Sequence, residues 1–304
     1  MSATANLQQR LGNQRDWIWR GWRIRYTYIR AAETSQKPPI IFLHGFGAAI
    51  GHWRHNLEVF SRSHTVYALD ILCFGASEKA TANYSVDLWV SQVYDFWKTF
   101  IGQPVILVGH SIGSLVSLAA AATHPEMVEG LVMMNVADPL LEKEQTPAFI
   151  YPVVGFVKNI VAFVALPLLM KPLFYFIRKP GFIRYGLKQA YVNPKAIADE
   201  LVEIFIRPPQ DRGSPGALLA LVRSSVSPNY SPNIKEILPN LSIPMLLIWG
   251  KQDRFFPVKS AQNFAKCNDK LQVIYLEDVG HCPHDECPER VNKEILEWID
   301  KYLD

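Results

Sequence analysis

The sequence predicts an α/β fold in which a mostly parallel, twisted sheet is flanked by helices and carries an inserted helical cap. The first observation behind this prediction is a series of short apolar runs without period-2 alternation, the pattern of parallel strands covered on both faces. The second is the helical spacing of apolar residues between several of these runs. The predicted strands cover residues 40–43, 65–69, 105–108, 131–134, 245–249 and 271–276.

The remaining elements of the core follow from local signals. A β-hairpin is expected over residues 17–31, turning near Arg20-Gly21. Ser85 is a suitable N-cap for a helix whose apolar residues recur in steps of three and four as far as Phe100. Further helices are predicted at residues 111–122, 258–267 and 288–302.

Between the fourth and fifth of these apolar runs, the alternation of strands and helices stops. Residues 139–235 are punctuated by prolines and predict a succession of helices rather than more sheet. We therefore expect two units: a core made of residues 1–138 and 236–304, and a helical cap made of residues 139–235.

Composition limits the class of protein. The chain has 304 residues, of which 49% are hydrophobic and 19% charged, which is enough to bury a sizeable core. The polar N-terminal stretch predicts neither a secretory signal nor an N-terminal anchor, and four scattered cysteines predict reduced thiols. We expect an intracellular, cytoplasmic protein. With a net charge of only +3, we expect no nucleic-acid partner.

The motif Gly109-His110-Ser111-Ile112-Gly113 directly follows a predicted strand and opens a predicted helix. Such a turn strains the backbone of the serine, and glycine on both sides avoids collisions with the strand and the helix. Strain of this kind is normally functional. The motif predicts that Ser111 is a nucleophile.

A serine hydroxyl needs a base to take its proton and an acid to orient that base. His281 follows the last predicted strand and is the favoured base, and Asp253 follows the preceding strand and is the favoured acid. Asp138, at the end of the 131–134 strand region, is the alternative acid. The order Ser111, Asp253, His281 is that of α/β-hydrolases rather than of chymotrypsin or subtilisin.

The turn His44-Gly45-Phe46-Gly47 after the first long strand suits an oxyanion site. We expect the backbone N–H groups of Phe46 and Ile112 to hold the developing negative charge. The segment His281-Cys282-Pro283-His284 with Cys287 contains zinc-ligand residue types. Because two of these residues are consecutive and no paired Cys-x-x-Cys occurs elsewhere, we expect no metal there.

Together these motifs resemble the α/β-hydrolase superfamily, on His44 to Gly47, Asp70 with Gly75-Ala76-Ser77, Gly109 to Gly113, Trp249 to Asp253, and Gly280-His281. The resemblance implies serine-type hydrolysis through an acyl-enzyme, without a metal or organic cofactor. Relatives with dehalogenase or epoxide-hydrolase activity have an aspartate where Ser111 stands, which argues against both activities. A weaker similarity links the chain to cyanobacterial and plastid members that resemble chlorophyll-dephytylating hydrolases.

The cap is apolar and basic. Residues 149–176 are rich in Val, Phe, Leu, Ile and Pro, but Lys158 and Lys171 leave only twelve residues between them, too few for a transmembrane helix. Two interpretations remain: a buried apolar face, or a surface that touches anionic lipid. We predict weak peripheral membrane contact through the basic residues Lys158, Lys171, Arg178, Lys179, Arg184, Lys188 and Lys195.

Either interpretation favours an apolar small-molecule ester over a sugar or peptide. The predicted function is hydrolysis of a carboxylic ester with a bulky apolar part, such as a phytyl or chlorophyll-type ester. The alternatives are a carbon–carbon bond hydrolase or a menaquinone-pathway-type lyase on the same triad, and a non-catalytic binding protein on a hydrolase scaffold. Expected substrate contacts are His44, Trp53, His110, Phe156 and Phe163, with Phe174 and Phe176 as further pocket candidates.

Overall fold

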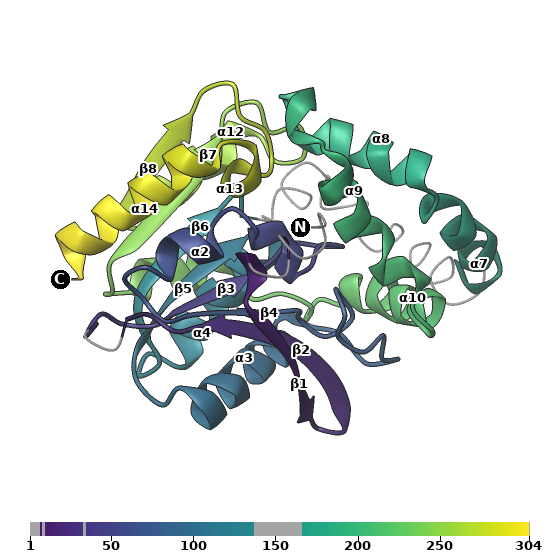
Figure 1. Ribbon diagram of the computed structural model, residues 1–304, viewed down its shortest axis with the longest axis horizontal. Coiled ribbons are helices and arrows are strands. Elements are labelled where there is room, and N and C mark those ends of the chain that lie inside the picture. The colour runs from purple at the N-terminus through teal and green to yellow at the C-terminus, as the bar shows by residue number, and fades with distance from the viewer. Residues whose placement is uncertain (1–6, 8–9, 33–34, 137–165, 304) are drawn as a thin grey trace, which may run out of the picture.

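An eight-stranded sheet forms the centre of the computed structural model, which describes residues 7, 10–32, 35–136 and 166–303 (Figure 1). The strand order is β1-β2-β4-β3-β5-β6-β7-β8. Among the described strands β2 alone runs against the others, pairing antiparallel with both β1 and β4. The strands are β1 (Asn13–Trp19), β2 (Trp22–Ile29), β3 (Ile40–Leu43), β4 (Val66–Leu69), β5 (Val105–His110), β6 (Val128–Met134), β7 (Met245–Gly250) and β8 (Leu271–Leu276).

The central strands are buried on both faces. In β3, Ile41 and Leu43 pack into one hydrophobic cluster and Ile40 and Phe42 into the other, and all four side chains are fully buried. Each face of the sheet therefore has its own core. This explains the missing period-2 alternation and confirms the prediction of a mostly parallel sheet covered by helices.

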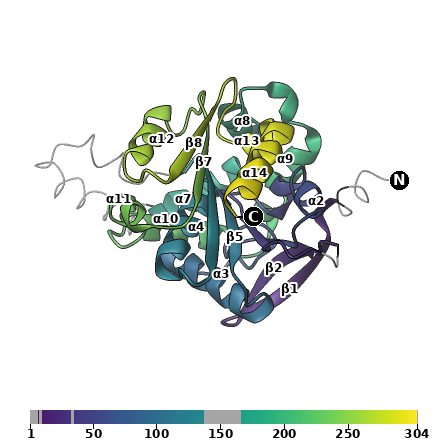
Figure 2. The same ribbon diagram turned by 90° about the vertical axis from the view of Figure 1, so that its left-hand side faces the viewer.

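Two layers of helices cover the sheet, as Figure 2 shows. Residues of α3, α4 and α12 belong to the larger hydrophobic cluster, and residues of α2 and α14 to the cluster on the opposite face. Ser85 caps α3 as predicted, because its hydroxyl accepts a 3.1 Å hydrogen bond from the Leu88 N–H. These helices are α2 (Leu57–Phe60), α3 (Val86–Phe100), α4 (Ile112–Thr123), α12 (Val258–Ala265) and α14 (Pro288–Tyr302).

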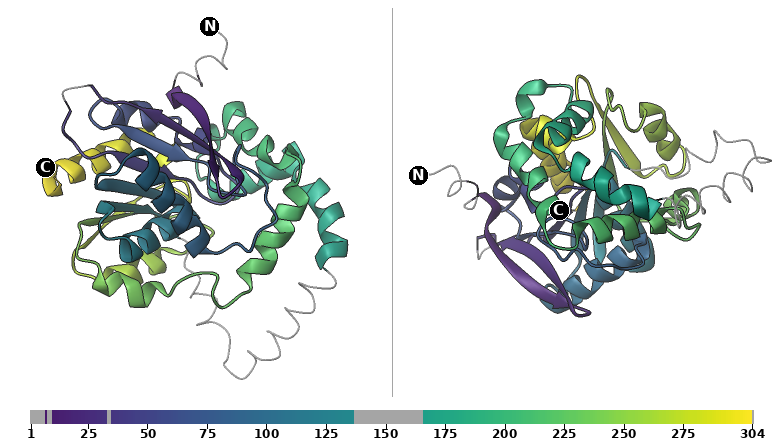
Figure 3. Two further views of the ribbon diagram at one scale, coloured as in Figure 1. Left: turned by 90° about the horizontal axis from the view of Figure 1, so that it is seen from below. Right: turned by 90° about the vertical axis from the view of Figure 1, so that its right-hand side faces the viewer.

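The described part of the inserted region is helical, as expected. Its helices gather on one side of the molecule (Figures 1 and 3) and contain a small core of their own that includes Leu187, Leu201 and Val202. They are α7 (Leu166–Ile177), α8 (Pro180–Ala190), η4 (Pro194–Ala196), α9 (Asp199–Ile206), η5 (Pro208–Gln210) and α10 (Ser214–Ser225). Short helices return the chain to the core or lie at the site: η1 (Ile50–Trp53), α11 (Ile234–Ile237), η6 (Leu238–Asn240) and α13 (Pro283–Glu286).

Four predicted residues, Asp138, Phe156, Lys158 and Phe163, lie outside the described residues. Within the described ranges, none of the helices combines the length and apolar character needed to cross a bilayer. The four cysteines are free thiols.

Candidate active site

Ser111 lies on the sharp turn between β5 and α4. Its backbone has φ 54° and ψ −116°, an unusual conformation for a residue with a side chain, and its N–H donates to the Met134 carbonyl at 2.9 Å. A Cβ placed on Gly113 would lie 2.1 Å from the Leu43 carbonyl oxygen. The motif therefore needs glycine at this position because α4 starts in direct contact with β3.

His281 and Asp253 meet across the loops that follow β8 and β7. The Nδ1 atom of His281 lies 2.8 Å from Oδ2 of Asp253, and the carboxylate is largely buried. Its Oδ1 also accepts hydrogen bonds from the N–H groups of Phe255 and Phe256 at 2.8 and 3.1 Å. Burial raises the pKa of Asp253, but the hydrogen bond and charge of His281 outweigh it, so the pKa falls below its usual value. Asp253 is thus suited to accept a hydrogen bond from Nδ1–H and to orient the ring.

Asn135 is a member of the site that the sequence did not reveal. It follows β6 with φ 43°, and its Nδ2 donates to Asp253 Oδ2 at 2.6 Å while its Oδ1 accepts from the Gly250 N–H at 3.3 Å. One signal in the sequence could have identified Asn135. It is an asparagine at the carboxyl end of an apolar strand, and asparagine tolerates the positive φ of a sharp turn. Asn135 therefore shares Oδ2 of Asp253 with His281.

The two expected oxyanion donors flank the nucleophile. Phe46 follows β3 and Ile112 begins α4, where the positive end of the helix dipole adds to the N–H. Among the described residues, neither N–H donates to a protein acceptor. A Cβ placed on Gly45 would lie 3.3 Å from Ser111 Cβ, so glycine lets the Phe46 turn approach the nucleophile.

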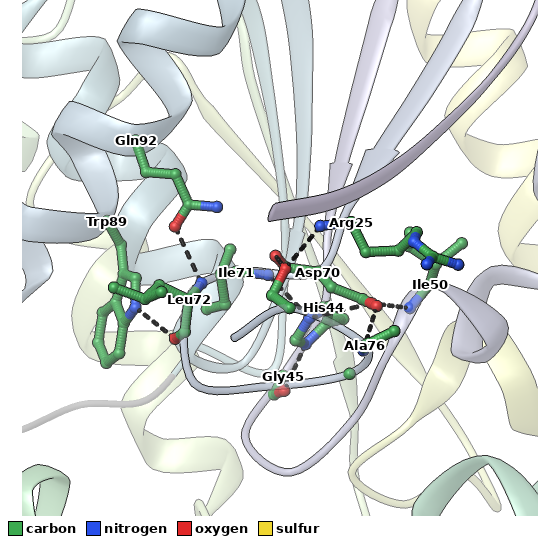
Figure 4. A network of polar contacts seen from close by, with 12 residues as sticks. Arg25, His44, Gly45, Ile50, Asp70, Ile71, Leu72, Ala76, Trp89 and Gln92 are labelled. Atoms are coloured by element: carbon green, nitrogen blue, oxygen red, sulfur yellow. Dashed lines mark hydrogen bonds and ion pairs between the residues drawn. The ribbon is translucent and has the colours of Figure 1, made fainter. Parts of the chain in front are cut away.

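A buried polar network behind this turn fixes its shape (Figure 4). Asp70 accepts hydrogen bonds from the N–H groups of Ile50 and Ala76 at 2.6 and 2.7 Å. His44 Nε2 accepts from the Ile71 N–H at 3.3 Å, which leaves Nδ1–H to donate to the Gly45 carbonyl at 2.8 Å. Burial lowers the pKa of His44, so the ring stays neutral. The conformation of the oxyanion turn therefore depends on side chains from two neighbouring loops.

Backbone contacts join His281 to the cap. The His281 N–H donates to the Ala190 carbonyl at the end of α8, at 2.7 Å. The Glu286 carboxylate accepts from the Gly280 N–H at 2.7 Å, and its other oxygen accepts from the N–H groups of Val192 and Asn193 at 2.7 and 2.5 Å. One carboxylate thus bridges the loop of the candidate base and the segment after α8. Nothing in the local sequence pattern identified Glu286.

A cavity of about 680 Å³ opens above Ser111 and His281. Its walls come from the core and from the cap, and most of the side chains are apolar. The lining includes Phe46, Phe74, Phe174, Ile183, Leu187, Phe205, Leu218, Leu221, Phe255 and Phe256. A cavity of this size and character suits a small apolar ligand.

The predicted substrate contacts divide into three groups. His110 and Phe174 line the cavity, whereas Phe176 points to solvent and is 54% exposed. His44 and Trp53 are buried and are not among the lining residues. Trp53 packs instead against Phe42 and His284, with ring centroids 5.1 and 4.3 Å away. The neighbouring residue in η1, His52, lines the cavity in place of Trp53.

A sheet of this topology with a strained serine turn at its carboxyl edge defines the class of α/β-hydrolases. Residues 38–288 match the sequence profile of the family described as alpha/beta hydrolase fold, and the chain belongs to this family. Its relatives include hydrolases, as the class predicts.

Two curated relatives show the range of chemistry in the family. Pheophytinase, chloroplastic, from Arabidopsis thaliana is 26% identical, over 93% of this chain and 65% of the relative. A 2-hydroxy-6-oxo-6-(2'-aminophenyl)hexa-2,4-dienoic acid hydrolase from Metapseudomonas resinovorans is 25% identical, over 90% and 88%. Among solved structures, a membrane phospholipase A superposes with a TM-score of 0.77 at 22% identity, over 99% and 90% of the two chains, which shows the shared fold. The match to pheophytinase supports the weaker resemblance to plastid members.

Proposed function

We propose that this protein is a serine hydrolase that cleaves a carboxylic ester with a bulky apolar moiety through an acyl-enzyme. The observation that carries the proposal is the mostly apolar cavity whose lining includes both Ser111 and His281. The contact of His281 with Asp253 supports the same roles. A charged or strongly polar substrate would lose its hydration in such a cavity without compensating hydrogen bonds.

In the proposed reaction Ser111 Oγ attacks the ester carbonyl carbon while His281 takes the hydroxyl proton. The N–H groups of Phe46 and Ile112 stabilise the tetrahedral oxyanion. Collapse breaks the bond to the alcohol oxygen, which leaves with the proton from His281, and the acyl group stays on Ser111. Water then attacks the acyl-enzyme with His281 as base, releasing the acid and restoring the serine.

The apolar walls predict how the rate depends on substrate length. Each buried methylene contributes about 0.8 kcal/mol, so kcat/KM should rise up to about fourfold per added carbon until the cavity is full. Together with the similarity to pheophytinase, this favours a long isoprenoid alcohol such as phytol as the alcohol part. The finer substrate proposal is therefore a phytyl or chlorophyll-type ester.

A panel of p-nitrophenyl esters of increasing chain length tests the proposal. We expect a burst of p-nitrophenol that Ser111→Ala abolishes, and labelling of Ser111 by a fluorophosphonate probe. No burst at any chain length, with turnover of a vinylogous diketone, would instead assign the carbon–carbon hydrolase activity that the dienoic acid hydrolase's name describes. Absence of both burst and labelling in folded protein would favour a binding protein.

The acid is tested in the same assay. Asp253→Asn should lower turnover by about 10³-fold or more, because the ring of His281 loses the carboxylate that fixes its tautomer. Asp138→Asn is the matched control and should retain most of the activity. The reverse result would transfer the role of acid to Asp138.

We further propose that the cap contacts anionic membranes, the source of lipophilic substrate. Exposed apolar side chains of α7 and α8 surround the basic residues Arg178 and Lys179: Leu173, Tyr175, Phe176, Phe182 and Tyr185, exposed by 40–61%. Apolar side chains beside cations suit the interface of an anionic bilayer. The proposed location is the cytoplasm and its membrane surfaces.

A further inference from the structure

Three buried histidines form a cluster beside the candidate active site. They come from η1, the end of β5 and α13, and one ring nitrogen of each of His52, His110 and His284 lies within 4.8 Å of one from each of the others. Four of their six ring nitrogens have no hydrogen-bond partner among the described residues: Nδ1 of His52, Nδ1 of His110, and both nitrogens of His284. Buried polar atoms are rarely left without a partner, so the cluster calls for a ligand.

The hydrogen bond made by His110 fixes its tautomer. Its Nε2 lies 2.8 Å from the carbonyl oxygen of His281, which can only accept, so Nε2 carries the proton. Nδ1 therefore presents a lone pair. Gly45 leaves room beside it, because a Cβ there would lie 2.7 Å from Nδ1.

His52 presents a second lone pair by the same logic. The Tyr191 hydroxyl donates its proton to Asp285 at 2.7 Å, so its oxygen must accept from His52 Nε2–H at 2.9 Å. The Nδ1 atom of His52 is thus unprotonated. Histidines that bind metals commonly donate their second nitrogen to a carbonyl, or through a relay to a carboxylate, as these two rings do.

We propose that His52, His110 and His284 form a binding site for a divalent transition metal such as Zn²⁺, beside but separate from the serine machinery. Three neutral imidazoles are a common ligand set for Zn²⁺, which binds nitrogen at about 2.0–2.1 Å. Ligands around a tetrahedral Zn²⁺ lie about 3.4 Å apart, so modest rotation of these rings closes the site. His52 and His110 also line the cavity, which would give an ion and its fourth ligand access to the cluster.

The charges around the cluster are of both signs: Arg54 opposes positive charge at His52 and His284, and two carboxylates lie nearby. Tyr191 lies between His52 and Asp285, and Asp285 pairs with Arg54 at 2.7 Å. Asp253 contacts the Nδ1 atom of His281. A bound dication would stand close to His281, whose ring centroid is 4.9 Å from that of His110. It would oppose the protonated form of His281, so we expect Zn²⁺ to inhibit hydrolysis and a chelator to restore it.

The test uses the full chain, stripped with EDTA and dialysed against Zn²⁺ alone at pH 7.5. Metal analysis should find one Zn²⁺ per chain, and His110→Asn and His284→Leu should each weaken binding at least 100-fold. His284→Leu removes no hydrogen bond between the ring and the part of the chain that the structure describes, where both ring nitrogens lack a partner. His124→Asn, at a separate, partly exposed site, is the control and should bind like the parent. Circular dichroism checks that each variant is folded.

Substitution with Co²⁺ distinguishes this site from one built on the cysteines of the same segment. The visible spectrum should show nitrogen ligation without a thiolate charge-transfer band, and Cys282→Ser should leave it unchanged. Failure to bind stoichiometric Zn²⁺, or binding that survives both histidine variants, would overturn the proposal. So would a crystal grown with Zn²⁺ in which an ordered water occupies the cluster. These readouts do not depend on the ester activity.

Discussion

At the scale of single residues, the site depends on groups that hold one carboxylate in place. Asp253 Oδ2 is shared by His281 and by Asn135, at 2.8 and 2.6 Å. Both hydrogen bonds act against the rise that burial causes in the pKa of Asp253. We therefore interpret Asn135 as a positioning residue that acts on the proposed base, His281, through Asp253.

The variant Asn135→Asp tests this role because aspartate keeps the shape and tolerates the positive φ of Asn135. The substitution replaces the amide donor by a second carboxylate that faces Asp253. Two carboxylates this close cannot both be ionised easily, so they hold one proton between them. We expect turnover to fall about 10- to 100-fold at pH 7 and the acidic limb of the pH–rate profile to move to higher pH. A uniform loss with an unchanged profile would indicate a purely structural role.

The sequence predicted that Ser111, Asp253 and His281 lie close together because each follows a predicted strand, and ends of parallel strands meet at one edge of the sheet. The structure brings His281 against Asp253, and Ser111 and His281 line one cavity. Asn135 and Glu286 were not predicted because Asp253 lies 118 residues from Asn135 and Val192 lies 94 residues from Glu286 in the chain. Trp53 was predicted to line the cavity from its aromatic character alone. Tertiary packing decides which side of η1 faces the cavity. In the structure His52, and not Trp53, is on that side.

At the scale of secondary-structure elements, the strands were predictable because runs buried on both faces are apolar throughout. The relation of the cap to the core was not predictable, because it depends on hydrogen bonds between segments that are distant in the chain. Glu286 in α13 joins the Gly280 N–H to the N–H groups after α8. The position of His281 is thus coupled to the end of that helix.

Replacing Glu286 by glutamine tests the coupling. The amide keeps one acceptor oxygen, so its NH₂ group must face at least one backbone N–H. We expect kcat to fall about tenfold with little change in KM for short esters, and the apparent melting temperature to drop by a few degrees. Glu289→Gln, exposed in the first turn of α14, is the matched control and should behave like the parent. If both substitutions had equal effects, Glu286 would not couple the His281 loop to the segment after α8.

At the scale of the whole molecule, buried histidines make the fold sensitive to acid. Burial lowers the pKa of His44, His52, His110 and His284. Below pH 6.5 the unfolded chain binds protons at these positions that the folded chain does not, so stability decreases as pH falls. We expect the free energy of unfolding in EDTA to drop between pH 7 and 5 by up to about 1.4 kcal/mol per pH unit for each histidine. Urea titrations that show constant or rising stability over this range would contradict the assignment.

The exposed face of α7 and α8 predicts where the molecule touches a membrane. Vesicles with anionic lipid should carry the protein upward in a flotation gradient at low salt, and neutral vesicles or high salt should not. The double variant Phe176→Ser/Phe182→Ser should reduce flotation several-fold. Tyr302→Ser, which alters an exposed aromatic residue at the far end of α14, is the control and should float like the parent. Protein that stays wholly unbound with anionic vesicles would exclude this contact.

The hydrogen bond from His281 N–H to Ala190 has a consequence for engineering and for divergence within the family. A cap that supplies an anchor for the base is not an independent module. Replacing it by the cap of a relative would change specificity only if the graft kept the backbone of residues 190–193 in register with the His281 loop. New substrate ranges are therefore more accessible by changing α7 and α10, whose Phe174 and Leu221 line the cavity without contributing to this anchor.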